Sequence, residues 1–275
     1  MVTDAVAAKG DALLAALRSM PAALVAFSGG VDSSYLAAVA HRAIGDRALA
    51  VTAVSPSLAR RELEAAAALA RRFGWRHRIV ATHEIRREEY ARNDPDRCYW
   101  CKTELFEVLQ PIAAEMRADI LVGTNADDLA EHRPGGRAAT ERGVRAPLVE
   151  VGLGKAEIRE LSARLGLPTA ERPASPCLAS RVAYGIPVTA ERLRRIERAE
   201  DFVRSLGFDV LRVRDHGDLA RIEVPLEEIE RIASVREEIA EHLSNLGFRY
   251  VTVDLGGFRS GSLNEVLAPP RVAGA

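Results

Sequence analysis

The sequence predicts an α/β protein with a doubly wound, mainly parallel sheet, followed by a smaller α+β domain. Two apolar runs of strand length, 22–27 and 48–54, are each followed by a segment with helical periodicity. The second of these helices, 60–72, ends before Gly74, and strand character returns at 78–81. Repeated strand–helix units fold as parallel sheets covered by helices on both faces, so these runs predict the doubly wound domain.

The smaller domain is predicted after residue 187. A proline-punctuated stretch, 168–187, interrupts the periodicity. The segments beyond it have the patterns of helix, strand, strand, helix and strand, at 190–206, 210–214, 220–224, 226–246 and 250–254. We therefore expect a doubly wound domain over 1–187 and an α+β domain over 188–275. Within the first domain, residues 133–137 (RPGGR) are expected to form a mobile loop.

The composition excludes several classes of protein. The 275 residues are 48% hydrophobic and 28% charged, which is typical of a globular protein with a proper core. A formal net charge of −1 argues against a general binder of nucleic-acid backbones. No run approaches the roughly 20 apolar residues that span a bilayer. We expect a cytoplasmic protein without a nucleic-acid or membrane partner, and the odd count of three cysteines argues against a disulfide framework.

Residues 28–34 (SGGVDSS) join the first strand to its helix through two glycines. Paired glycines let the backbone approach an anion without Cβ obstruction, and a helix N-terminus directs N–H groups and the positive end of its dipole at it. Phosphate is the natural occupant. The loop lacks the Lys-Ser/Thr ending of a Walker A loop and the GxGxxG spacing. The structural alternative is an ordinary strand-to-helix turn capped by serine.

This segment resembles the signature loop of the PP-loop ATP pyrophosphatases, SGGxDSS. The matching residues are Ser28, Gly29, Gly30, Val31, Asp32, Ser33 and Ser34. The resemblance implies that ATP is bound here and cleaved between its α and β phosphates, so that a substrate oxygen is adenylated and pyrophosphate leaves. It also implies a catalytic role for Asp32, and backbone atoms near Val54 that read the adenine edge.

A further strand, 119–123, leads into Thr124-Asn125-Ala126-Asp127-Asp128. Oxygen ligands at the carboxyl end of a strand suit a Mg²⁺ ion bound to ATP phosphates. The alternative is an Asn/Asp turn with helix capping. The resemblance to GTNxDD in adenylating PP-loop enzymes favours ATP or metal proximity for Asn125 and Asp127.

The three cysteines are placed in a way that suggests chemistry. Cys98 and Cys101 form CYWC, and Cys177 lies far away in the proline-rich stretch. A CxxC pair can be redox-active, half of a zinc site or part of an iron–sulfur site. With Cys177 it could hold three irons of a [4Fe–4S] cluster and leave the fourth open. The alternatives are unrelated thiols at a helix start and, for Cys177, a buried small side chain, although Arg172 and Arg181 would favour its thiolate.

Four longer motifs narrow the resemblance to one family. They are RCYWCK (97–102), SPCLASR (175–181), LRVRDHGDLARIE (211–223) and YVTVDLGGFRSGSLNE (250–265). Together they resemble the ATP-dependent sulfur transferases of the LarE type, which act in biosynthesis of the nickel-pincer nucleotide cofactor, and the similarity spans nearly the whole chain. The resemblance implies a small-molecule nucleotide substrate, pyridinium-3,5-biscarboxylic acid mononucleotide, whose carboxylate is adenylated and then converted to a thiocarboxylate. It also implies a homo-oligomer.

The source of the sulfur divides this family. In members with a lone cysteine at the position of Cys177, the side chain forms a thioester and gives up its own sulfur. Members that also carry the CxxC hold a cluster whose extra sulfide is delivered catalytically. Because this chain has all three cysteines, the resemblance favours the cluster route, with Cys98, Cys101 and Cys177 as ligands and sacrifice of Cys177 as the alternative.

An acidic mononucleotide needs cationic partners. Arg212 and Arg214 alternate on one predicted strand, so their guanidinium groups face the same side. The candidates for substrate contact are Glu200, Arg212, Arg214 and Arg259. Ser180 and Arg181, beside the reactive cysteine, are expected to be catalytic by orienting a carboxylate. Each arginine taken singly is more often a solvated surface charge, and Glu200 lies on a charged helix.

Three other functions are compatible with the loop. A PP-loop tRNA thiolase combines cysteines with adenylation, but a basic surface or a zinc module would be expected. An amidating PP-loop synthetase would leave SPCLASR without explanation. A nucleotide-binding module without catalysis would bind ATP but release no pyrophosphate.

Overall fold

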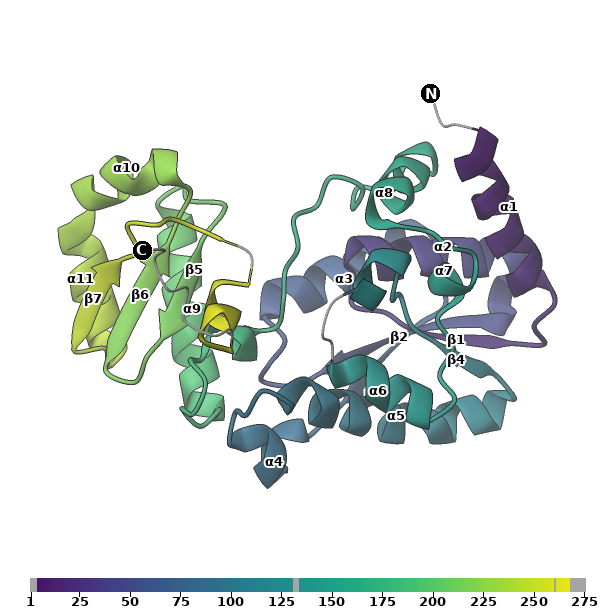
Figure 1. Ribbon diagram of the computed structural model, residues 1–275, viewed down its shortest axis with the longest axis horizontal. Coiled ribbons are helices and arrows are strands. Elements are labelled where there is room, and N and C mark those ends of the chain that lie inside the picture. The colour runs from purple at the N-terminus through teal and green to yellow at the C-terminus, as the bar shows by residue number, and fades with distance from the viewer. Residues whose placement is uncertain (1–3, 131–133, 260, 268–275) are drawn as a thin grey trace, which may run out of the picture. The chain divides into compact units, whose positions relative to one another are not determined.

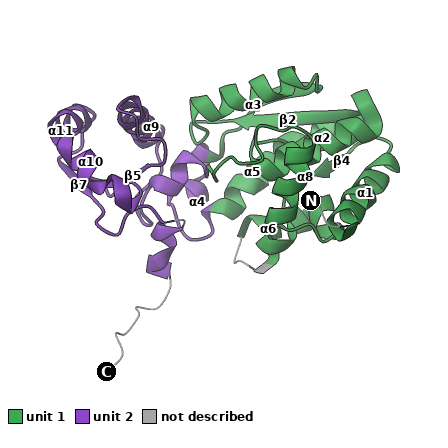
Figure 2. Ribbon diagram, turned by 90° about the horizontal axis from the view of Figure 1, so that it is seen from above, with its two compact units in different colours: residues 1–84, 98–175 green, residues 85–97, 176–275 purple. Residues whose placement is uncertain are grey.

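The computed structural model describes residues 4–130, 134–259 and 261–267. The chain forms two compact units, one of residues 1–84 and 98–175 and the other of residues 85–97 and 176–275 (Figure 2). This division differs from the boundary expected at residue 187, because residues 176–187 belong with the second unit. Residues 85–97 join it too, since the Asn93 side-chain amide donates to the carbonyl of Ala183 at 2.8 Å.

The first unit contains the predicted parallel sheet. Its strands are β1 (Ala23–Ala26), β2 (Ala48–Val54), β3 (His77–Ala81) and β4 (Asp119–Leu121). Their order is β3-β2-β1-β4, and every neighbouring pair is parallel. Figure 1 labels β1, β2 and β4 of this sheet. All four carboxyl ends therefore lie at one edge of the sheet, which is where α/β proteins bind their ligands.

Helices cover both faces of this sheet, as the doubly wound prediction requires. They are α1 (Asp4–Arg18), α2 (Val31–Ile44), α3 (Arg60–Arg72), α5 (Arg97–Met116), α6 (Pro134–Glu141), α7 (Pro147–Glu150) and α8 (Lys155–Arg164). Val25 of β1 packs in a core with α1, α2, α3 and α8, whereas its neighbour Leu24 packs with α5 on the opposite face. Within the described residues, no helix combines the length and apolarity needed to cross a bilayer.

The second unit is the smaller α+β module. Its sheet has the order β5 (Arg212–Asp215), β6 (Leu219–Glu223), β7 (Tyr250–Val253), with β5 antiparallel and β7 parallel to β6. Its helices are α4 (Glu88–Ala91), α9 (Ala190–Ser205), α10 (Ile229–Ser234) and α11 (Arg236–Asn245). The helix expected over 226–246 is thus divided, since a short 3₁₀ turn, Leu226–Glu228, and two separate α-helices occupy that stretch.

The expected mobile loop at 133–137 was wrong for its described part, since Pro134 begins α6 (Arg133 lies outside the described residues). A Cβ added at Gly135 would lie 3.0 Å from Cγ of Lys102 and 3.4 Å from the carbonyl oxygen of Cys98. The glycine that suggested a loop instead lets α6 approach α5 closely.

Candidate active site

The phosphate loop (residues 28–34) connects β1 to α2 in an internally bonded turn. Gly29 has a φ of +74°, a left-handed conformation that favours glycine. The hydroxyl of Ser33 lies 3.0 Å from that of Ser28 and donates to the carbonyl of Gly30 at 3.2 Å. No side chain of the described residues caps α2, which begins after Gly30. The first N–H groups of this helix have no intrahelical acceptor, so they are suited to bind phosphate oxygens.

Asp32 lies in the first turn of α2 and is paired with a residue distant in sequence. Its Oδ2 accepts a hydrogen bond from Nζ of Lys155 at 2.7 Å. Its Oδ1 is buried and has no hydrogen-bond partner in the described part of the chain. A buried carboxylate oxygen without a partner suits a hard cation such as Mg²⁺. The residues at this position therefore fit the metal ion that the resemblance implies.

The turn after β4 packs directly on the phosphate loop. A Cβ added at Gly123 would lie 2.8 Å from the backbone nitrogen of Ser33, so only glycine fits there. The buried Asn125 accepts the N–H of Asp127 through Oδ1 at 2.9 Å, and Asp127 accepts the N–H of Lys155 at 2.7 Å. These bonds are those of an Asn/Asp turn and a helix start, so the turn geometry alone accounts for both residues. Their contact with ATP or metal stays a prediction.

Val54 ends β2 at the same edge of the sheet. Val54 is half-buried, and its carbonyl oxygen accepts the N–H of Thr82, which follows β3, at 3.0 Å. The second lone pair of that carbonyl and the neighbouring backbone remain as candidates for reading a base edge.

Cys98 and Cys101 lie in the first two turns of α5, three residues apart and thus on one helix face. Cys98 is exposed and Cys101 half-buried, and no disulfide joins the three described cysteines. The thiols match the donor type of an iron–sulfur ligand. However, the described residues contain no group of three His, Cys, Asp or Glu side chains arranged to hold a metal ion. The third expected ligand, Cys177, belongs to the second unit.

Cys177 is exposed, and its backbone is held firmly. Its carbonyl oxygen accepts the hydroxyl of Ser180 at 2.7 Å and the guanidinium of Arg181 at 2.9 Å. Arg181 is 1% exposed and forms an ion pair of 3.0 Å with Glu200, which is also 1% exposed. Arg181, predicted as catalytic, and Glu200, predicted as a substrate contact, thus bind each other, and Arg181 in turn fixes the carbonyl of the cysteine.

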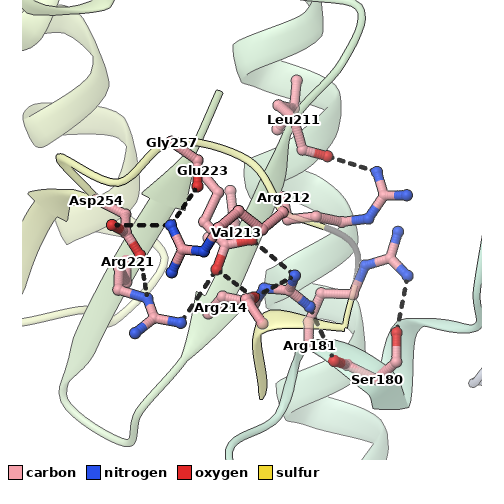
Figure 3. A network of polar contacts seen from close by, with 12 residues as sticks. Ser180, Arg181, Leu211, Arg212, Val213, Arg214, Arg221, Glu223, Asp254 and Gly257 are labelled. Atoms are coloured by element: carbon pink, nitrogen blue, oxygen red, sulfur yellow. Dashed lines mark hydrogen bonds and ion pairs between the residues drawn. The ribbon is translucent and has the colours of Figure 1, made fainter. Parts of the chain in front are cut away.

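A buried polar network surrounds β5 in the second unit (Figure 3). Arg212 and Arg214 are both buried, whereas an arginine taken singly was expected to be more often a solvated surface charge. Arg214 donates to Glu223 at 2.7 Å, to Ser262 at 3.0 Å and to the carbonyl of Ser180 at 3.1 Å. Its Nε is buried and has no hydrogen-bond partner within the described residues. An anionic ligand would satisfy this donor.

Arg212 and Arg259 have different surroundings. The guanidinium of Arg212 donates to the carbonyl of Leu211 at 2.6 Å and lies 5.2 Å from the ring of Phe258. Arg259 is 42% exposed on its side chain and donates to Glu265 at 3.2 Å. Arg259 can contact the substrate only if its ion pair with Glu265 opens. Opening costs little free energy, because exposed ion pairs are weak.

Two groups that bond predicted site residues, one in each unit, escaped the sequence analysis. Lys155 reaches Asp32 across 123 positions of the chain, a separation that no local motif encodes. Glu223 is fully buried and accepts hydrogen bonds from Arg214, Arg221 and Ser262. Its signal was a carboxylate two residues after Arg221 in a strand whose other residues are apolar, where an unpaired charge would be costly.

Known proteins resemble this chain over different lengths. A family model described as asparagine synthase matches residues 10–116. An uncharacterized protein of Synechocystis sp. is 47% identical over 89% of this chain and 92% of its own length. One component of the glutamine-hydrolyzing GMP synthase of Thermococcus kodakarensis is 35% identical, over 66% of this chain and 63% of its own.

One relative with a stated activity covers both units. The pyridinium-3,5-bisthiocarboxylic acid mononucleotide synthase of Lactiplantibacillus plantarum is 36% identical over 269 residues, which are 97% of this chain and 98% of that protein. Similarity of this degree over the full length shows common family membership, and the phosphate loop agrees with it. The chain therefore belongs to the LarE-type family of PP-loop enzymes and is an ATP-dependent enzyme that works through adenylation.

Proposed function

We propose that this enzyme converts a carboxylate of pyridinium-3,5-biscarboxylic acid mononucleotide into a thiocarboxylate, in biosynthesis of the nickel-pincer cofactor. The observation that carries the proposal is the 36% identity to a synthase of the bisthiocarboxylic acid over 97% of the chain. The GMP synthase component, in contrast, aligns with only 66% of it. An amidating reaction or a tRNA thiolase reaction is therefore less well supported than sulfur transfer to the mononucleotide.

The first step is activation of the carboxylate. The N–H groups at the start of α2 bind the phosphates of ATP, and Asp32 holds the Mg²⁺ that accompanies them. The substrate carboxylate attacks the α-phosphorus, the bond to the β-phosphate oxygen breaks, and pyrophosphate leaves. Lys155, which contacts Asp32 at 2.7 Å, supplies a positive charge next to the negative charge that develops on the departing group.

The second step forms the carbon–sulfur bond. In the sacrificial route the Cys177 thiolate attacks the acyl carbon, the bond to AMP breaks, and a thioester forms. A base then removes the α-proton of residue 177, the Cβ–S bond breaks, and the thiocarboxylate leaves with the sulfur. The side chain remains as dehydroalanine. The exposed thiol and the anchored carbonyl of Cys177 support its part in this step.

In the alternative that we favour, Cys98, Cys101 and Cys177 hold a [4Fe–4S] cluster. When bound, such a cluster supplies a sulfide on the iron that has no protein ligand. The support is the donor type and the i, i+3 placement of Cys98 and Cys101 on α5. Cys98→Ser would leave one iron without its thiolate, so cluster absorbance should be lost and each chain should yield at most one sulfur.

The substrate is proposed to bind around β5. The unsatisfied Nε of Arg214 and the buried guanidinium of Arg212 are suited to an anionic mononucleotide. Ser180 and Arg181 would orient the carboxylate near Cys177, and Glu200 would hold Arg181 in place. Arg259 would neutralise the phosphate of the substrate.

Anaerobic purification with iron and sulfide analysis, followed by intact mass after turnover, tests the proposal. Release of pyrophosphate that depends on the mononucleotide is expected, and Asp32→Asn should abolish it. Loss of one hydrogen sulfide from the polypeptide would indicate sacrifice, whereas an unchanged mass with repeated product would indicate the cluster. Cys177→Ala should retain ATP binding and lose sulfur transfer. Full transfer in that variant would refute the role of Cys177.

A further inference from the structure

Residues 168–175, here called the strap, are the last stretch of the first unit, and Cys177 follows two residues later. The strap follows α8 and is irregular, yet it is anchored to that helix. Arg159 of α8 donates to the carbonyl of Ala170 and, at 3.0 Å, to the carbonyl of Arg172. These two hydrogen bonds from Arg159 therefore fix the backbone of the strap shortly before Cys177.

Arg172 connects the strap to the phosphate loop. One amino group of its guanidinium, Nη1, donates to the carbonyl oxygen of Gly29 at 3.1 Å. The other, Nη2, donates to Oε2 of Glu62 at 2.8 Å. The second carboxylate oxygen of Glu62 accepts the hydroxyl of Ser175 at 3.0 Å. A single planar fork thus joins the loop, the start of α3 and the end of the strap.

The bond to Gly29 also orients a backbone donor of the phosphate loop. In a trans peptide the C=O and the following N–H point in opposite directions, so holding the carbonyl of Gly29 also orients the N–H of Gly30, which donates to Oγ of Ser28 at 3.4 Å. Gly29 is already restricted, since a Cβ there would lie 2.9 Å from that of Ala66 in α3. Arg172 therefore completes the alignment of the anion-binding loop.

We propose that Arg172 is a positioning residue for both half-reactions: it holds the phosphate loop in its ATP-binding form and holds the strap that leads to Cys177. The inference rests on the proposed function for the identity of the two steps. Glu62 fixes the orientation of the Arg172 guanidinium and also binds the end of the strap through the hydroxyl of Ser175. The three side chains should therefore have graded and separable effects.

Ser175→Ala removes only the hydrogen bond between the end of the strap and Glu62. It should therefore lower sulfur transfer, while the rate of pyrophosphate release stays within about twofold of that of the unaltered protein. Arg172→Gln removes both arms of the fork. It should raise the Kd for ATP and slow pyrophosphate release, each by about tenfold or more, as misplacement of a reacting group by a fraction of an ångström does. Glu62→Gln should reduce sulfur transfer more than adenylation, because the bond from Arg172 to Gly29 survives.

Hydrogen–deuterium exchange separates positioning from a general loss of stability. Arg172→Gln should speed exchange in peptides covering both 28–34 and the strap, whereas Ser175→Ala should speed it in the strap alone. Arg164→Gln and Glu64→Gln are matched controls, since both residues are exposed, and neither segment should change in them. ATP affinity by calorimetry completes the set.

Arg172→Lys keeps the charge but not the fork, so it should recover only part of the ATP affinity. Full recovery would show that charge alone matters and would overturn the proposal. Wild-type exchange in 28–34 together with wild-type ATP affinity in Arg172→Gln would overturn it as well. If the unaltered protein released no pyrophosphate, the proposed function would fail alone, because exchange and ATP affinity would still decide the role of Arg172.

Discussion

Replacing Gly123 by alanine should damage ATP use by moving the phosphate loop. Gly123 follows β4, and its added Cβ would lie 2.8 Å from the backbone nitrogen of Ser33 and 3.0 Å from its Cα. Both obstructing atoms are backbone of the first turn of α2, so no side-chain rotation relieves the clash. The turn and the helix must separate.

The size of this effect follows from the geometry. Ordinary contact between such atoms is about 3.5 Å, so the helix start must shift by roughly 0.7 Å, the difference from the 2.8 Å found. Overpacking of this kind costs about 1–3 kcal/mol of folding free energy. A displacement of about 1 Å at a reacting centre costs about 100-fold in rate. We therefore expect kcat/KM for pyrophosphate release to fall by about 10- to 100-fold.

The assay is pyrophosphate release at varied ATP, with thermal unfolding measured in parallel. Gly136→Ala is the matched control, because a Cβ at Gly136 meets nothing within 4 Å and the residue lies inside α6. That variant should keep wild-type kinetics and be neutral or slightly more stable. Wild-type kinetics in Gly123→Ala would refute the inferred contact between the β4 turn and the phosphate loop.

Three further predictions concern single charges. Lys155→Met removes the ammonium from Asp32, so pyrophosphate release should fall by about 100-fold; an unchanged rate would exclude a role for that charge. Glu223→Gln weakens a buried pair with Arg214, which should cost up to about 3 kcal/mol, to be measured by denaturant unfolding against the unaltered protein. Burial lowers the pKa of His41, whose Nδ1 bonds a backbone carbonyl and whose Nε2 is buried without a partner in the described residues. The contribution of neutral His41 to the free energy of unfolding is therefore complete above the unfolded pKa of about 6.5. It is lost as the pH falls from there through the lower pKa of the folded state. Calorimetry should show a smaller fall of Tm from pH 7.5 to 5.5 in His41→Asn than in the unaltered protein.

Local patterns were sufficient for the fold class and for the phosphate loop. Strand, glycine turn and helix are contiguous in 22–44, so their periodicity and the two glycines already encode the loop. The confirmed doubly wound sheet follows from the same repeated unit. The prediction failed at Pro134, where glycines suggested a loop but serve close packing of α6 on α5.

The sequence by itself determined most of the elements, the nucleotide loop and the candidate cysteines, because each depends on residues that are near neighbours in the chain. Only the tertiary structure brought Lys155 to Asp32 and Arg172 to Gly29. Both pairs lie at the carboxyl edge of a parallel sheet, where segments more than a hundred residues apart in the sequence come together. No local spacing specifies which side chains meet there, because that depends on how the whole sheet folds.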